Sequence, residues 1–269
     1  VRLVGSEMCI RDRIYEAKGR PSDNPLILHI SKREELDAIA ARIPETAEKL
    51  MDAFWPGPMT LIFEKTKAVP YETTGGLDTV AVRMPSHEGA RQLIESAGVP
   101  VAAPSANTSG RPSPTTAEHV KEDLWGRIDM IIDGGLVGIG VESTIIDVTE
   151  ETPTILRPGH ITKNMIAKVI GTVQMDAGLS GLDQSVKPKA PGMKYRHYAP
   201  KASMTVIQGK KEAVIRRIEE LAAEYPKEKV GILATDETLS CYTHGQVVSA
   251  GSRNEHTIEQ GLYLSLIHI

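Results

Sequence analysis

The chain has 269 residues, 41% of them hydrophobic and 25% charged, and this globular composition allows one large domain or two smaller ones. Aromatic residues make up only 4% and the net charge is -4, which argues against a nucleic-acid platform of stacked rings and against broad non-specific binding to nucleic acid. The two cysteines give no disulfide framework or metal-ligand spacing, and no apolar run approaches the roughly 20 residues of a membrane helix. We therefore expect an aliphatic core, no membrane association and a cytoplasmic location.

The chain begins with a segment that carries no structural pattern. Residues 1–13, VRLVGSEMCIRDR, show neither helical nor strand periodicity, and we expect them to be non-native. The residues that follow are typical of the last turn of a helix that ends at Gly19. A turn-rich loop over residues 20–25 then leads into residues 26–30, which predict a buried strand.

Helices and strands alternate in the next part of the chain. Ser31, with Glu34 three residues later, predicts a capping box at the start of a helix that Pro44 stops. The elements predicted after it are a helix over 45–54, a strand over 59–63, a strand over 79–83, and a helix that Ser86 caps and Gly98 ends. Alternation in the strand over 79–83 places Val80 and Val82 on one face.

Residues 99–115, VPVAAPSANTSGRPSPT, combine a short apolar strand with a dense cluster of turn and hydroxyl residues. Pro104 marks the point where strand pairing stops. Ser113, followed by Pro114, predicts the start of a helix that ends near Leu124. Because a helix N-terminus attracts anions, the stretch indicates a phosphate or carboxylate site, with an ordinary surface loop as the alternative.

Further strands are predicted over 128–133, 143–148 and 154–157, followed by a short helix that ends near Gly171. The sequence GGLVGIG at 134–140 resembles a dinucleotide fingerprint only loosely, because a strand and not a helix follows it; we expect a hairpin or loop there. The order of elements predicts an α/β domain over residues 1–171, built on a mixed, twisted α+β sheet.

The remainder of the chain divides into a linker and a second domain. Residues 172–200 lack apolar periodicity and predict a linker, but their segment APGMKYRHYAP is too specific for a plain spacer. Residues 201–269 predict a smaller, Rossmann-like α/β domain that is truncated at its end. Its predicted elements are a strand over 204–207, a helix over 210–224, and strands over 230–234 and 247–249.

Cationic side chains stand beside Pro or Gly at the ends of the predicted elements: Lys18, Arg20, Arg83 and Arg157. Each alone could be a solvated surface charge. Together they predict an anion site at the edge of a sheet, where hydroxyl and amide groups can complete the set of donors. No acid–base or nucleophilic triad is evident, and we expect the carboxylates considered for Mg²⁺, Asp133, Glu142 and Asp147, to be surface groups.

Several segments carry a family resemblance. Lys18-Gly-Arg20, paired with Ser105-Ala-Asn107, resembles the KxR…SxN signature of the YrdC-like superfamily, the threonylcarbamoyl-AMP synthases. TVAVRMP, VESTIIDV and ILRPG are similar to other segments of that family, and APGMKYRHYAP followed by a small domain is similar to its two-domain branch. A TVYGLG-like motif expected near the N-terminus is replaced by residues 1–13, so we expect part of the threonine pocket to be missing.

The resemblance implies a YrdC-like fold and a nucleotidyltransferase reaction. L-threonine, bicarbonate and ATP condense to threonylcarbamoyl-adenylate and pyrophosphate, with Mg²⁺ carried by the nucleotide and no protein ligand to the metal. The product supplies the N6-threonylcarbamoyl group of tRNA adenosine, which implies a tRNA-modifying transferase complex downstream and a weak tRNA contact. Positioning and charge neutralisation are the main demands of this chemistry, which the cationic residues meet without a covalent nucleophile.

The resemblance also implies roles for individual residues. Those implied to be catalytic are Lys18, Arg20, Ser105 and Asn107. Those implied to bind ATP are Arg20, Asn24, Thr79, Ser105, Ser113, Arg157, Tyr195 and Tyr198. The last two belong to the linker motif within residues 172–200, which the resemblance implies can fold over the pocket as a lid. Those implied to bind threonine are His29, Arg83, Ala103 through its backbone, and Ser143.

Two other functions are compatible with a basic concavity. A module that binds structured RNA without chemistry is disfavoured by the acidic net charge. A module that transfers a carbamoyl group from carbamoyl phosphate is disfavoured because the chain lacks zinc-finger cysteines and carries the APGMKYRHYAP segment.

Overall fold

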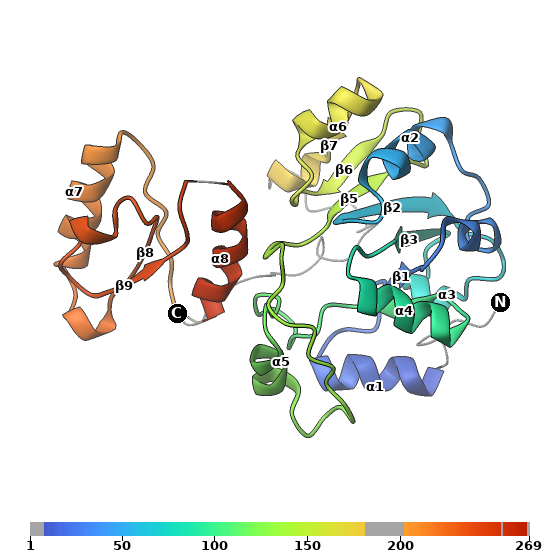
Figure 1. Ribbon diagram of the computed structural model, residues 1–269, viewed down its shortest axis with the longest axis horizontal. Coiled ribbons are helices and arrows are strands. Elements are labelled where there is room, and N and C mark those ends of the chain that lie inside the picture. The colour runs from blue at the N-terminus through green and yellow to red at the C-terminus, as the bar shows by residue number, and fades with distance from the viewer. Residues whose placement is uncertain (1–7, 181–201, 254, 268–269) are drawn as a thin grey trace.

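The computed structural model describes residues 8–180, 202–253 and 255–267, which form a main unit and a smaller C-terminal unit (Figure 1). A seven-stranded sheet in the order β4-β1-β3-β2-β5-β6-β7 organises the main unit. Its strands are β1 (Ile27–His29), β2 (Met59–Glu64), β3 (Thr79–Arg83), β4 (Val101–Ala103), β5 (Thr144–Asp147), β6 (Thr154–Arg157) and β7 (Gln174–Met175). The pairs β1–β3, β2–β5 and β6–β7 are parallel and the other three are antiparallel, which confirms the predicted mixed sheet.

Side chains from alternate positions of the strands form a core on each face of the sheet. Val80 and Val82 of β3 lie in the larger core, as predicted, whereas Ala81 lies in a smaller cluster on the other face. The larger core also holds Leu61 and Phe63 of β2, both almost completely buried. Since every second residue of a strand points to the same side, local sequence alone determines which face each one occupies.

Helices pack around this sheet, and their bounds follow the predicted pattern closely. They are α1 (Met8–Lys18), α2 (Glu45–Phe54), the short α3 (Tyr71–Thr74), α4 (Glu88–Ala97), α5 (Ala117–Leu124) and α6 (Lys163–Ile170). Helix α2 presents Leu50 and Met51 to the larger core, and Ile166 of α6 joins them there. Gly98 ends α4 with a φ of 67°, a left-handed conformation that glycine adopts without strain.

Three predicted helix starts are wrong in detail. The helix expected from Ser31 is a 3₁₀ helix, η1 (Arg33–Ala38), and the carboxylate that accepts from the Ser31 and Lys32 amides belongs to Glu35 and not to Glu34. His87, not Ser86, caps α4 by accepting from Ala90 N at 3.2 Å. Helix α5 begins after Thr116, whose hydroxyl accepts from His119 N.

Other predicted boundaries also shift. Residues 8–13 belong to α1, although the sequence over 1–13 shows no helical periodicity. Residues 128–133 form no strand; they run as coil with Met130 75% exposed and Ile132 71% exposed. Strand β7 extends the sheet beyond residue 171, into the segment predicted as a linker, and is followed by η2 (Ala177–Ser180). The predicted lid residues Tyr195 and Tyr198 lie outside the described residues.

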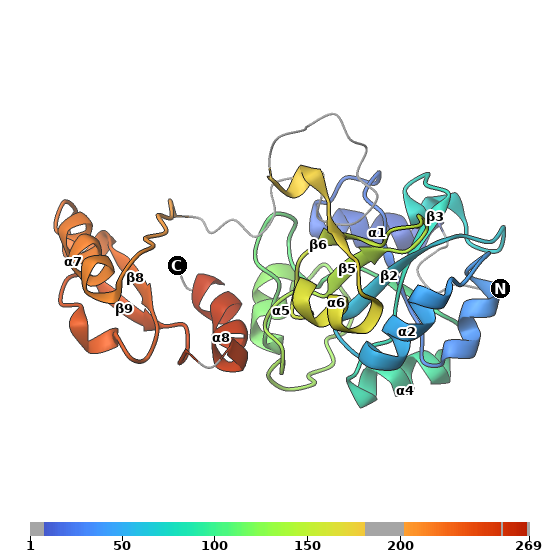
Figure 2. The same ribbon diagram turned by 90° about the horizontal axis from the view of Figure 1, so that it is seen from above.

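The C-terminal unit pairs β8 (Gly231–Ala234) with β9 (Gln246–Ser249) in parallel, against α7 (Lys211–Ala222). Ala222, Ile232 and Tyr242 form its core. The unit also contains η3 (Lys227–Lys229), η4 (Leu239–Cys241) and α8 (Glu255–Ile267), but the predicted strand over 204–207 is coil. Figures 1 and 2 show α8 between the small sheet and the main unit. Among the described residues, no helix is long and apolar enough to cross a membrane.

Replacement of Leu61 by Ala tests the assignment of this residue to the larger core. Leu61 is fully buried, so Leu61→Ala should lower the free energy of unfolding by about 2–5 kcal/mol through lost burial and a residual cavity. Leu93 of α4 is 57% exposed, and Leu93→Ala should change it by less than about 0.5 kcal/mol. Urea unfolding followed by circular dichroism compares the two variants, and equal losses would contradict this assignment of the core.

Candidate active site

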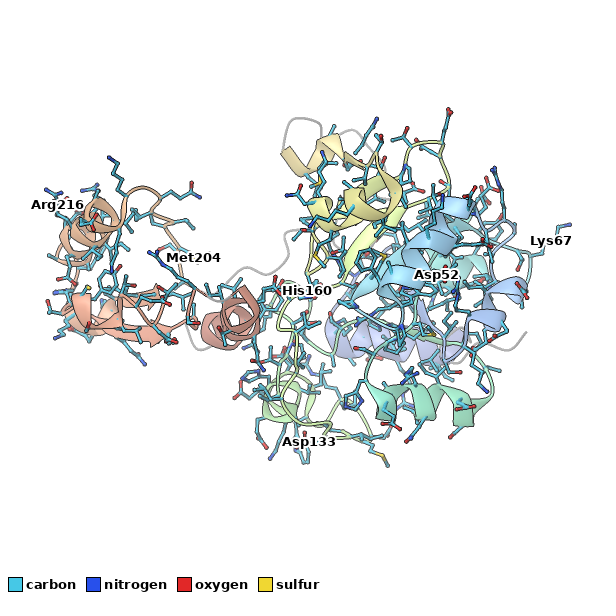
Figure 3. All side chains as sticks on the ribbon, turned by 45° about the horizontal axis from the view of Figure 1, so that its top comes forward. Asp52, Lys67, Asp133, His160, Met204 and Arg216 are labelled. Atoms are coloured by element: carbon cyan, nitrogen blue, oxygen red, sulfur yellow. The ribbon has the colours of Figure 1, made fainter. Side chains whose placement is uncertain are left out.

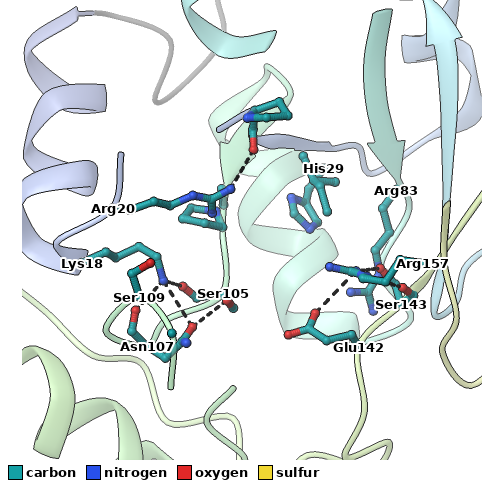
Figure 4. A pocket seen from close by; sticks show the side chains of 15 residues that line it. Lys18, Arg20, His29, Arg83, Ser105, Asn107, Ser109, Glu142, Ser143 and Arg157 are labelled. Atoms are coloured by element: carbon teal, nitrogen blue, oxygen red, sulfur yellow. Dashed lines mark hydrogen bonds and ion pairs between the residues drawn. The ribbon is translucent and has the colours of Figure 1, made fainter. Parts of the chain in front are cut away.

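A cavity of about 180 Å³ opens between the β1–β3–β4 part of the sheet, the loop after β4 and the segments that flank β5 and β6 (Figure 4). Sites that enclose a drug-sized ligand usually measure roughly 300–1,000 Å³. The cavity formed by the described residues is therefore smaller than a site of that kind. The residues that line it are Lys18, Arg20, Pro25, Ile27, His29, Arg83, Ala103, Pro104, Ser105, Asn107, Ser109, Gly110, Glu142, Ser143 and Arg157.

Lys18 connects the end of α1 to the loop after β4. Its Nζ donates to the carbonyl oxygens of Ser105 and Asn107 and lies 3.2 Å from Asn107 Oδ1. Ser109 N donates to the Lys18 carbonyl at 2.8 Å, so backbone and side chain hold the same loop. Gly19 follows with a φ of 60°, which ends α1 and sends the chain toward Arg20.

The Ser105–Asn107 segment is ordered by its own side chains. Ser105 Oγ donates to Asn107 Oδ1 at 2.6 Å, and Asn107 Nδ2 donates to the carbonyls of Thr108 and Arg111 at 3.1 and 2.8 Å. Asn107 is only 5% exposed. The KxR and SxN segments are therefore one hydrogen-bonded unit, and Lys18 contacts the loop rather than pointing alone into the cavity.

Burial strongly affects the charge of Lys18. The residue is 4% exposed, and desolvation, assisted by the nearby Arg20 guanidinium and opposed by Glu142, lowers the pKa of Lys18 to about 7. In its protonated form the group has three donors, which match the three oxygens around it. Lys18 is consequently close to the balance between its two charge states at neutral pH.

Arg157 and Ser143 form the other side of the cavity (Figure 4). Arg157 Nε and Nη2 donate to the Ser143 carbonyl at 3.1 and 2.9 Å, and Nη2 also lies 2.9 Å from Ser143 Oγ. Glu142 Oε2 is 3.5 Å from the same Nη2. The segments that carry Glu142 and Arg157 can lie this close together because residue 159 is glycine: a Cβ there would lie 2.3 Å from the Glu142 carbonyl.

His29 and Arg83 lie side by side at the ends of the parallel strands β1 and β3. Arg83 Nε donates to the Gly57 carbonyl at 3.1 Å, and burial lowers the pKa of its guanidinium. Burial, with Arg83 as second cause, lowers the pKa of His29 to about 4. The imidazole is therefore neutral at pH 7, and its buried Nδ1 has no hydrogen-bond partner.

The structure brings nine of the predicted site residues to this cavity: Lys18, Arg20, His29, Arg83, Ala103, Ser105, Asn107, Ser143 and Arg157. Three others do not line it. Asn24 is buried behind the loop before β1, with its carbonyl accepting from Tyr15 Oη, and Thr79 begins β3 at the end opposite Arg83. Ser113 is not a helix cap; its hydroxyl donates to Glu142.

Sequence reasoning treated Glu142 as a surface carboxylate, which is wrong, because it lines the cavity and pairs with Arg157. Asp147 is also buried and accepts from Thr149 N and Oγ1. Asp133 is exposed, as expected, and accepts from Gly135 N. Glu142 precedes Ser143 in the segment VESTIIDV, which resembles the family, and this position is the feature of the sequence that could have indicated a place in the site.

The arrangement favours an anionic ligand. In the part of the chain that the structure describes, Lys18, Arg20, Arg83 and Arg157 line the cavity together with a single carboxylate, Glu142. Guanidinium forks suit phosphates and carboxylates, and partial burial strengthens their attraction for an anion.

The chain is similar to known proteins along both of its units. Residues 7–159 match the family model described as Telomere recombination, and residues 161–269 match that of the C-terminal domain of threonylcarbamoyl-AMP synthase. The threonylcarbamoyl-AMP synthase of Pyrococcus abyssi is 51% identical over 96% of this chain and 74% of its own length. That of Bacillus subtilis is 50% identical over 94% of this chain and 73% of its own length.

A solved structure supports the same conclusion. The crystal structure of Pyrococcus abyssi Sua5 complexed with L-threonine superposes with a TM-score of 0.91, covers 98% of this chain and 77% of that chain, and is 49% identical. The superposition spans both the main unit and the C-terminal unit. The chain therefore belongs to the threonylcarbamoyl-AMP synthase family.

Proposed function

We propose that this chain is an L-threonylcarbamoyladenylate synthase, which converts L-threonine, bicarbonate and ATP into threonylcarbamoyl-AMP and pyrophosphate. The observation that carries the proposal is the cavity in which four cations face one carboxylate and a neutral histidine. Support comes from the identity of about half of the residues with synthases of that name.

The reaction needs two bonds to form. The threonine nitrogen forms a C–N bond to the bicarbonate carbon, and water leaves. An oxygen of the resulting carbamate then forms an O–P bond to the α-phosphorus of ATP, and pyrophosphate leaves with the electron pair of the broken P–O bond. Every reactant except the zwitterionic amino acid is an anion, so charge neutralisation and alignment are the main tasks of the protein.

The two sides of the cavity suit different parts of this reaction. On our proposal Arg20, Ser105 and Arg157 contact the nucleotide phosphates, with Asn24, Thr79 and Ser113 nearer the nucleoside. Lys18 and Asn107 hold the loop that carries Ser105, a role supported by the hydrogen bonds between them. Lys18 is thus a positioning residue as well as a source of charge.

Threonine is proposed to bind at the side of β1 and β3. Arg83 would pair with its carboxylate, while Ser143 and the Ala103 backbone would complete the set of polar contacts. His29 lines this side of the cavity, and its neutral ring keeps one nitrogen that can accept a hydrogen bond from the threonine hydroxyl or amine. A protonated imidazole could not accept such a bond, so the low pKa of His29 suits the role.

Mg²⁺ is proposed to arrive with ATP. The described part of the chain has no group of three or more His, Cys, Asp or Glu side chains that could hold a metal. The cavity offers Glu142 alone, and this fits Mg²⁺ that keeps phosphate and water oxygens as its other ligands. Bound there, the metal would neutralise phosphate charge. Electron paramagnetic resonance of Mn²⁺ with ATP tests the contact: unchanged Mn²⁺ affinity in Glu142→Gln would exclude it.

The product defines the next step. Threonylcarbamoyl-AMP is an activated acyl donor, and we propose that a tRNA-modifying transferase complex in the cytoplasm consumes it, with only weak contact between this chain and tRNA. A non-catalytic RNA-binding function would leave the inward-facing cations of the cavity without a role.

The function is tested by reactant omission. The chain is incubated with radiolabelled ATP, Mg²⁺, L-threonine and bicarbonate, and AMP and threonylcarbamoyl-AMP are separated by chromatography. We expect adduct only when all reactants are present and L-serine to replace L-threonine poorly. AMP formation that ignores threonine and bicarbonate would reject the synthase in favour of a simple hydrolase.

Arg157→Ala should lower kcat/KM for ATP by the equivalent of about 2–4 kcal/mol, the usual scale for loss of a preorganised charge contact. Arg157→Lys should recover only part, because an ammonium cannot reproduce the fork that contacts Ser143. Arg217→Ala, at a half-exposed position of α7, serves as the control for removal of a positive charge. Steady-state AMP production measures all three, and wild-type kcat/KM in Arg157→Ala would contradict the assignment.

The lowered pKa of Lys18 predicts a pH-dependent stability. The unfolded chain holds the Lys18 proton up to its ordinary pKa of 10.5, whereas the folded chain loses it near 7, so the burial penalty is full below pH 7 and is relieved as the pH rises. From about pH 7 to about pH 9 the wild type should gain about 2 kcal/mol relative to Lys18→Met. Urea unfolding of both proteins at each pH measures the difference, and a constant difference would contradict the shift.

A further inference from the structure

Side chains of helix α8 in the C-terminal unit contact two loops of the main unit, one at Val137 and one at His160. Glu259 forms an ion pair with His160 Nδ1, and both side chains are largely buried, 26% and 15% exposed. Because a carboxylate can only accept, the ring nitrogen is the donor. Gln260 Nε2 donates to the Val137 carbonyl at 3.3 Å. Figure 3 shows His160 on the side of the main unit that faces α8.

The backbone of α8 also lies directly against Gly140. A Cβ at Gly140 would lie 2.4 Å from the Glu259 carbonyl oxygen and 2.5 Å from that of Gln260. These are main-chain atoms of a helix, so they cannot rotate aside as a side chain could. Gly140 is not among the glycines with positive φ, and its need for glycine therefore comes from this close approach alone.

Both contacts are adjacent in sequence to the anion cavity. Gly140 comes two residues before Glu142, and His160 comes three residues after Arg157. Glu142 and Arg157 pair in the cavity at 3.5 Å, and Gly159 brings their two segments into backbone contact. Any shift of the loop at 137–140 or of His160 is thus transmitted to that pair through only a few bonds.

The solved Sua5 structure supports this arrangement, since its superposition covers 98% of this chain and so includes both units. A C-terminal unit that formed no interface with the main unit would need neither a glycine-dependent backbone contact nor a partly buried ion pair.

We propose that α8 is a positioning element for the nucleotide side of the site, holding Glu142 and Arg157 in place through Gly140, His160 and Glu259. The C-terminal unit thereby raises the affinity for ATP without touching the nucleotide. The inference rests on the proposed function, in which Arg157 contacts the phosphates of ATP. Gly140, His160 and Glu259 are positioning residues.

The chain provides a matched pair of variants for the test. Gly140→Ala should displace α8, whereas Gly138→Ala adds the same methyl group in the same loop where nothing lies within 4 Å. We expect KM for ATP to rise about fivefold to tenfold in Gly140→Ala, with kcat and KM for threonine within about twofold of wild type. Gly138→Ala should leave all three constants within about twofold. Melting temperatures of both variants verify that they are folded.

A second set of variants keeps the test independent of Gly140→Ala folding. His160→Ala and Glu259→Ala should each raise KM for ATP, and the double variant should raise it no further than the larger single effect, because the two side chains act as one contact. If Gly140→Ala and Glu259→Ala, both folded, kept the wild-type KM for ATP, the positioning role would be wrong.

Calorimetric titration of ATP separates this inference from the proposed function. A wild-type chain that binds ATP but forms no threonylcarbamoyl-AMP would refute the synthase, while the comparison of ATP affinity between Gly140→Ala and Gly138→Ala would still decide the role of α8.

Discussion

The site depends on several positively charged side chains that lie close together in a partly buried cavity. Like charges repel, and burial removes the hydration that would otherwise stabilise each of them. Main-chain carbonyls offset that cost. The carbonyls of Ser105 and Asn107 accept hydrogen bonds from Lys18, and the carbonyl of Ser143 accepts them from Arg157. Among the described residues that line the cavity, Glu142 supplies the only full negative charge. An anionic substrate relieves the remaining imbalance, so the folded chain is prepared for its ligand before the ligand arrives.

Much of the sheet follows from local sequence, and nine of the residues that line the cavity were predicted as site residues. Strand β3 occurs at the predicted residues, since alternation of apolar residues reports directly which face is buried. Lys18, Arg20, Ser105 and Asn107 meet in one cavity, as their family resemblance implied, although their individual roles stay predictions. Proline and glycine punctuation located the loops well because those residues restrict or free the backbone irrespective of tertiary context.

The errors arise where distant parts of the chain decide the outcome. Ser113 has the right chemistry for a helix cap, yet its hydroxyl donates to Glu142, and Thr116 takes the cap. Residues 128–133 have an apolar composition suited to a strand, but none of the described strands pairs with them. Glu142 lies in the segment before β5 and pairs with Arg157 of β6, and no periodic pattern in the sequence predicts an ion pair between side chains of two different segments.

The order of the strands has a consequence for synthesis of the protein. Asn107 contacts Lys18 across a separation of 89 residues. Arg157 belongs to β6, which pairs with β5, and β5 pairs in turn with β2 and through it with β3. Contacts so distant in sequence form late and slowly. A nascent chain therefore has no complete anion cavity until residue 157 has left the ribosome, and any ligand that binds only the completed cavity would stabilise finished molecules over partly folded ones.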